Sequence, residues 1–112
     1  MIMTVKELAT QCNLTVKNLG NPETELSSVY CCDLLSFVMG KAPAGAAWVT
    51  IMGNMNSVAV ASLAEIGVIV LADGVQPDQN ALQKAAENDI NLLTSAAPIF
   101  ETALAIHQAS SA

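Results

Sequence analysis

The chain has 112 residues, of which 53% are hydrophobic and only 12% are charged. This length fits a single domain over residues 1–112, and the apolar fraction excludes a disordered chain. Ten acidic residues oppose four basic ones, all of them lysine, and the net charge is −6. Without arginine or clustered lysines the chain cannot neutralise phosphates, which excludes nucleic acids and anionic membrane surfaces as partners.

The sequence carries no recognisable export or membrane signal. Its first residues lack a basic stretch followed by an apolar one. Residues 42–64 carry no charge, but glycine, proline and asparagine interrupt them, so we expect no transmembrane helix. The three cysteines, Cys12, Cys31 and Cys32, are an odd number. This favours reduced, buried thiols in a cytoplasmic protein.

The chain begins with a pattern typical of a helix followed by a strand. Thr4 and Glu7 have the spacing of a capping box, which predicts a helix as far as about Cys12. Residues 14–19 alternate between apolar and polar and predict a half-buried strand.

Residues 25–31 predict a second strand, with Val29 and Cys31 pointing inward. Asp33 is in position to cap a short helix after that strand. Gly40 is expected to end this helix.

From residue 46 onward, strands and helices alternate. Apolar residues 46–51 and 67–72 predict buried strands, the second of them central, and residues 90–94 predict a last short strand. The expected helix starts are, in order, Asn54 or Asn56, Asp78, and Pro98. The alternation predicts an α/β fold, a three-layer α/β/α sandwich with a mixed, largely parallel sheet.

Motifs of the common catalytic classes are missing from the sequence. There is no P-loop, no dinucleotide fingerprint and no nucleophile elbow. His107, the only histidine, lies near the end of the chain, where we expect a solvated surface residue. Asp33 follows Cys31 and Cys32 and would raise a thiol pKa, which argues against a redox or metal site. We expect no enzyme activity, no metal and no cofactor.

Two loops form the expected ligand site. In open α/β sheets, ligands bind beyond the carboxyl ends of parallel strands, where neighbouring connections diverge. The loops after strands 46–51 and 67–72 lie at such ends, and the first leads into a helix with free backbone amides. The candidate ligand-binding residues are Gly53, Asn54, Met55, Asn56, Ser57, Asp73 and Gly74. Helix capping and turn formation are the alternative role for these residue types.

Essentially the whole chain resembles the DRTGG domain. The resemblance lies in residues 4–8, 32–35, 48–51, 53–61, 67–78 and 92–95 and in the closing helix. The start is also similar to the amino-terminal domain of HPr kinase/phosphorylase. Where the family has Gly-Asp-Arg and Thr-Gly-Gly, this chain has Gly53-Asn54-Met55 and Ala72-Asp73-Gly74.

The resemblance implies a three-layer domain that is regulatory and not catalytic. Relatives are fused to CBS pairs in nucleotide-regulated pyrophosphatases, or to phosphotransacetylases, and tend to pair as dimers. In HPr kinase the chemistry belongs to a separate P-loop domain. We therefore expect a stand-alone cytoplasmic regulatory domain that acts through contacts with a protein partner. The alternative is a small-ligand sensor, with an adenine nucleotide as the ligand to test.

Composition and resemblance together predict a homodimer. A domain of this size leaves much surface exposed, and a large apolar patch is unusual on a monomer. A two-fold contact is the commonest way to cover such a patch. The expected face holds Met39 and Met52 to Met55, with Trp48 inside the domain or at the contact. The alternative is that exposed alanines account for the apolar excess.

Overall fold

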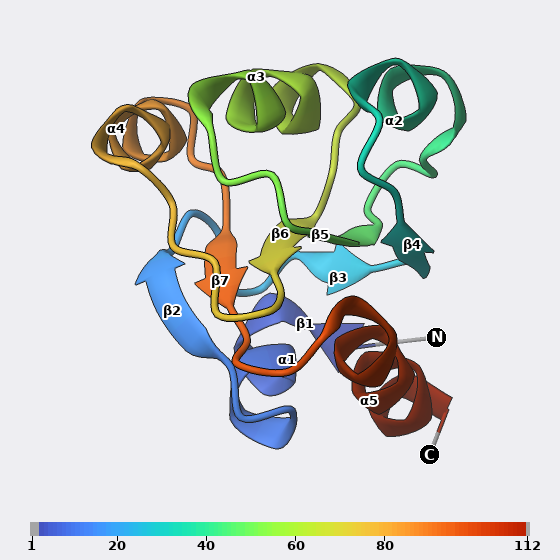
Figure 1. Cartoon of the computed structure of the whole chain (residues 1–112). Helices are drawn as coiled ribbons and strands as arrows, with labels where there is room; N and C mark the ends of the chain where they lie inside the picture. Colours follow the sequence, from blue (N-terminus) through green and yellow to red (C-terminus); the bar gives the residue numbers. More distant parts are fainter. Residues whose placement is uncertain (1–2, 112) are drawn as a thin grey trace.

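A five-stranded sheet lies between two helical layers in the computed structural model, which describes residues 3–111. The strands are β1 (Met3–Thr4), β2 (Thr15–Asn18), β3 (Glu25–Leu26), β4 (Val29–Cys31), β5 (Ala47–Thr50), β6 (Val68–Leu71) and β7 (Leu92–Thr94). The helices are α1 (Val5–Gln11), α2 (Leu35–Lys41), α3 (Met55–Leu63), α4 (Gln79–Glu87) and α5 (Ile99–Ser111). Helices α2, α3 and α4 cover one face, and α1 and α5 the other (Figure 1). The predicted three-layer α/β/α sandwich is confirmed.

The strand order of the main sheet is β2-β7-β6-β5-β4. Strands β4, β5, β6 and β7 run parallel, while β2 pairs antiparallel with β7 at one edge. Strands β1 and β3 form a separate antiparallel pair. The sheet is therefore mixed and largely parallel, as predicted.

Strand β6 is central, and all its residues are buried. Ile69 and Leu71 pack under the α2–α4 layer, while Val68 and Val70 pack against the layer of α1 and α5. Each face of the sheet thus has its own apolar core, which explains why this strand is a continuous apolar run.

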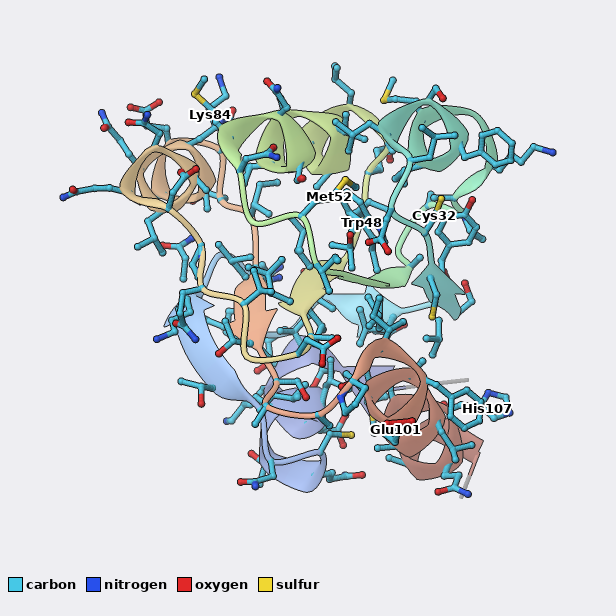
Figure 2. All side chains as sticks on the ribbon, viewed as in Figure 1. Cys32, Trp48, Met52, Lys84, Glu101 and His107 are labelled. Carbon is cyan, nitrogen blue, oxygen red and sulfur yellow. The ribbon has the colours of Figure 1, made fainter. Side chains whose placement is uncertain are left out.

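Trp48 belongs to the core under α2 and α3. Its side chain is 0% exposed, and its indole Nε1 donates a hydrogen bond to the carbonyl oxygen of Cys32 at 2.9 Å. Figure 2 shows it between the sheet and these helices, near Met52, whereas Glu101 and His107 lie on α5. Of the two expected places for Trp48, the interior is therefore confirmed.

Three helices begin where the sequence predicted a cap. The Thr4 hydroxyl accepts from the amide of Glu7, and the Glu7 carboxylate accepts from the amide of Thr4, which confirms the capping box. Asn54, and not Asn56, caps α3. The Asp78 carboxylate caps α4 by accepting from the amide of Ala81 at 2.7 Å.

The single strand predicted over residues 25–31 is wrong. Leu26 is the last residue of β3 that pairs with β1. The amide of Ser27 instead bonds to the carbonyl oxygen of Gly45, and the carbonyl oxygen of Ser28 accepts from the amide of Ala47 in β5. Two short strands in different sheets result. Val29 packs against the α1 and α5 core as expected, but Cys31 is exposed.

The predicted limits of α2 are also wrong. Leu34 occupies the cap position without a side-chain hydrogen bond, because the Asp33 carboxylate is engaged elsewhere. Gly40 lies inside the helix, which continues to Lys41. Pro43 ends it, because the residue before a proline is held in extended backbone.

Candidate functional site

The connections of the parallel strands diverge at one place only within residues 3–111. The segments after β4, β5 and β6 all cross to the face covered by α2, α3 and α4, and only the segment after β7 crosses to α5 (Figure 1). The divergence therefore lies between β6 and β7. The first predicted loop, after β5, therefore does not lie at a divergence, because α3 and α4 pack side by side on the same face. The second predicted loop, after β6, does.

The first predicted loop forms a helix cap. The Asn54 side-chain oxygen accepts from the amide of Ser57 at 3.0 Å and from its hydroxyl at 3.4 Å. Ser57 is buried, whereas Met55 and Asn56 are exposed on the first turn of α3. The capping role proposed as the alternative is therefore present at Asn54 and Ser57.

The second predicted loop is bonded to the segment after β7. The amides of Asp73 and Gly74 donate to the carbonyl oxygens of Ala97, at 2.7 Å, and Ser95, at 2.9 Å. Both residues have positive φ, 58° for Asp73 and 70° for Gly74, which turns the chain sharply at the end of β6. Asp73 and Gly74 thus belong to the place where the connections diverge.

Gly53 is where the two predicted loops touch. Its carbonyl oxygen accepts from the amide of Asp78 at 3.0 Å, and a Cβ at this position would lie 2.9 Å from the carbonyl oxygen of Gln76. The fold therefore brings Gly53 against the second loop. Asn54 and Ser57 bond to each other, and Asp73 and Gly74 bond toward β7, so the predicted residues fall into two groups.

A pocket of about 280 Å³ opens at the divergence between β6 and β7. It is lined by Asn13, Thr15, Gly74, Gln76, Thr94, Ser95 and Ala96. Of these residues, only Gly74 was predicted as a site residue. The sequence did contain one signal for this pocket, because Thr94 and Ser95 also lie at the end of a parallel strand. The pairing of that strand with β2 could not be predicted from the sequence.

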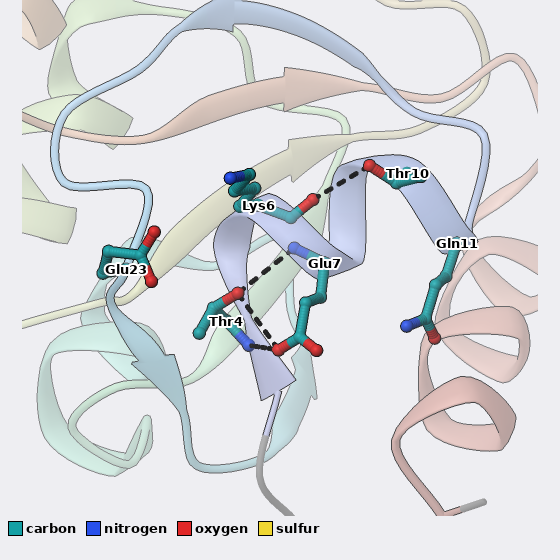
Figure 3. A pocket seen from close by; sticks show the side chains of 6 residues that line it. All are labelled: Thr4, Lys6, Glu7, Thr10, Gln11 and Glu23. Carbon is teal, nitrogen blue, oxygen red and sulfur yellow. Dashed lines mark hydrogen bonds between the residues drawn. The ribbon is translucent and has the colours of Figure 1, made fainter.

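A larger hollow of about 390 Å³ lies over α1 and is lined by Thr4, Lys6, Glu7, Thr10, Gln11 and Glu23 (Figure 3). The Thr4 and Glu7 side chains bond to each other and to each other's backbone, and the Thr10 hydroxyl donates to the carbonyl oxygen of Lys6. These groups hold the first helix, so this hollow has a structural explanation.

The three cysteines are free thiols, but the expectation that all are buried is wrong. Cys31, the last residue of edge strand β4, is exposed, and Cys12 and Cys32 are half-buried. Although Cys31 as a whole is exposed, partial desolvation by its neighbours raises the pKa of its thiol, and the Asp33 carboxylate raises it further. A raised pKa disfavours the thiolate, which is the reactive form.

Three further observations concern metal ligands, membrane helices and the histidine. Within residues 3–111, no three His, Cys, Asp or Glu side chains lie close enough to hold a metal ion. In the same part of the chain, no helix has the length and apolar run that crossing a bilayer requires. His107 is exposed on α5, as expected.

Comparison with known proteins relates this fold to a regulatory region. No protein-family model and no curated protein matches the chain. A solved structure of the CBS and DRTGG domains of the regulatory region of Clostridium perfringens pyrophosphatase, complexed with the activator diadenosine tetraphosphate, is similar at a TM-score of 0.77. The identity is 12%, and the match covers 94% of this chain and 46% of that one. At this identity the likeness establishes the fold alone.

Proposed function

We propose that this chain is a non-catalytic regulatory domain of the DRTGG type that acts through contacts with protein. The observation that carries the proposal is the likeness, at a TM-score of 0.77 over 94% of the chain, to the regulatory region of a pyrophosphatase. The sequence resemblance around β5 and β6 supports the same assignment. We propose that the domain works alone, and that its three free thiols suit the reducing cytoplasm.

Three polar side chains that follow strands β4, β5 and β6 support a non-catalytic role. The Asp33 carboxylate bonds to Thr50, the Asn54 amide caps α3, and the Asp78 carboxylate caps α4. Each is engaged in holding the fold, whereas a catalytic acid, base or nucleophile must be able to reach a substrate.

Phosphorus NMR tests the absence of catalysis. The full chain is incubated with magnesium and, in turn, ATP, pyrophosphate and diadenosine tetraphosphate. We expect no product above the buffer control. Turnover that scales with protein concentration would overturn the proposal.

We propose that the domain forms a homodimer through the exposed apolar side chains around α2 and the start of α3. Phe37 is 50% exposed, Met39 44% and Met55 45%. Trp48 is fully buried and takes no part in this face. Self-association is the contact we commit to, because an identical chain presents the same apolar patch and a two-fold axis covers both copies at once.

Light scattering coupled to size exclusion tests the dimer. The expected mass is twice the 11.6 kDa of the chain. Met55→Lys should shift the peak toward the monomer, whereas Phe100→Lys, which changes a still more exposed apolar side chain on the opposite layer, should not. A mass of one chain across the whole peak would overturn the dimer.

Ligand sensing is the second candidate function. Two observations favour it: the similar regulatory region is complexed with an adenine nucleotide activator, and Gly53 brings the two predicted loops into contact. The candidate residues remain Gly53, Asn54, Met55, Asn56, Ser57, Asp73 and Gly74.

Thermal shift against ATP tests this candidate. A ligand at about 100 times its dissociation constant stabilises a fold by about 2.7 kcal/mol. Asn54→Asp keeps the cap of α3 but adds a negative charge that should abolish a nucleotide effect. Asn88→Asp, at the far end of α4, is the matched control and should not. An unchanged melting temperature in the wild type excludes ATP from these loops.

A further inference from the structure

The pocket between β7, β2 and the loop after β6 lies where the neighbouring connections diverge, the place where open α/β sheets hold ligands. Its lining contains amides and hydroxyls but no charged side chain. The nearest charged residues along the chain are Lys17 and Asp73, which are opposite in sign.

Thr94 is the side chain that points to a ligand. The residue is only 6% exposed, it lines the pocket, and its hydroxyl bonds to no other group among residues 3–111. Every fully buried side-chain nitrogen or oxygen in that part of the chain has a partner, so the Thr94 hydroxyl must be reached from the pocket. The hydroxyl is thus open to water although the rest of the residue is buried, and a ligand in this pocket can replace that water as its hydrogen-bond partner.

Neighbouring groups extend this polar surface. Thr15 is the register partner of Thr94 on the antiparallel strand, so the two side chains stand beside each other on one face of the sheet. Ser95 is already satisfied: its hydroxyl lies 2.8 Å from that of Thr102 and accepts from the amide of Ala97. Ser95 therefore fixes the wall, while the two threonines face the pocket.

Two side-chain amides complete the recognition groups. The Gln76 nitrogen donates to the carbonyl oxygen of Gly74 at 3.3 Å, which holds the side chain across the loop and leaves its oxygen as an acceptor. Asn13 presents both a donor and an acceptor. An amide that offers both is the group that pairs with the edge of a nucleobase.

We propose that this pocket binds a small uncharged molecule of the nucleoside class, through Thr94, Thr15 and the amides of Asn13 and Gln76. The volume of about 280 Å³ is just below the range of about 300–1,000 Å³ typical of ligand pockets, which suits one nucleoside. A phosphate has no cation to pair with in this lining, so a nucleotide should bind more weakly than its nucleoside. The inference rests on the ligand-sensing candidate but assigns the ligand to different residues.

Amide NMR titration of the full chain with adenosine tests the proposal, because it detects weak binding and locates it. Adenosine at millimolar concentration should shift the signals of Thr94, Thr15, Gly74 and Gln76, and ATP at the same concentration should shift them less. Loss of one neutral hydrogen bond in Thr94→Val should weaken adenosine binding about fivefold. Thr10→Val, on the hollow over α1, is the matched control and should bind as the wild type does.

Thr15→Val keeps the test decisive if Thr94→Val does not fold, because Thr15 is exposed on an edge strand. It too should weaken adenosine binding. Absence of shifts, or ATP shifts as large as those of adenosine, would overturn the proposal. Shifts confined to residues 53–57 would overturn binding in this pocket and would support binding at the loop before α3. Neither result bears on the separate tests of the dimer and of catalysis.

Discussion

The Asp33 carboxylate accepts a hydrogen bond from the hydroxyl of Thr50 at 2.6 Å. The same oxygen accepts from the amide of Ile51 at 3.1 Å, and Thr50 is fully buried. One side chain thus joins the ends of β4 and β5 at the edge of the sheet. This contact, and not a helix cap, is what Asp33 contributes to the fold.

Asp33→Ala should lower the free energy of unfolding by about 1–3 kcal/mol, because it leaves the buried hydroxyl of Thr50 without its acceptor. Urea denaturation measures the loss. In a double-mutant cycle with Thr50→Val, the second change should cost less once Asp33 is gone. Losses that simply add would show that the two side chains do not stabilise each other.

Gly53→Ala should destabilise the protein by about 1–3 kcal/mol, the usual cost of overpacking. Its Cβ would lie 2.9 Å from the backbone oxygen of Gln76 and 3.2 Å from Cδ1 of Leu71, and the backbone here is held by the bond to Asp78. Gly40→Ala is the matched control, because a Cβ there meets nothing within 4 Å. In the helix interior it should stabilise by about 0.5–1 kcal/mol. Equal melting temperatures for the two variants would contradict the close contact of the loops.

Val70→Asp should abolish cooperative folding. Val70 is 0% exposed in the central strand and pairs with Val49 and Leu93, so a carboxylate there would be buried without a partner. Val16→Asp, on edge strand β2 where the side chain is 44% exposed, should change stability by no more than about 0.5 kcal/mol. Solubility and the urea transition measure both variants. A soluble Val70→Asp protein with a sharp transition would be incompatible with this strand order.

The parts of the fold that depend on local chemistry could be predicted from the sequence. The Thr4–Glu7 capping box, the Asp78 cap and the buried strand around Val70 each follow from residues adjacent in the chain. Their partners are either a few residues away or, for Val70, simply apolar. For such elements the pattern itself contains the physical cause.

The parts that depend on distant partners could not be predicted. Asp33 has a residue type suited to capping, but its partner Thr50 lies 17 residues away and offers a buried hydroxyl. The candidate pocket has the same origin, because Thr15 meets Thr94 only once β2 pairs antiparallel with β7. The site prediction therefore reached Gly74, at the rim, and missed the threonines.

The reactivity of Cys31 should depend on pH in a way that reports its surroundings. Burial is the larger cause of its raised thiol pKa, and the Asp33 carboxylate is the second. A higher pKa leaves less thiolate at a given pH, so the alkylation rate should reach its midpoint at a higher pH than in a model peptide. Iodoacetamide labelling of a Cys12→Ser, Cys32→Ser chain, followed by mass spectrometry, measures this midpoint. Asp33→Asn removes the charge but not the burial, so the midpoint should fall yet stay above that of the peptide. Asp89→Asn, which neutralises a carboxylate before β7, should leave it unchanged. A wild-type midpoint at or below that of the peptide would mean that Cys31 is neither shielded from water nor close to the Asp33 charge.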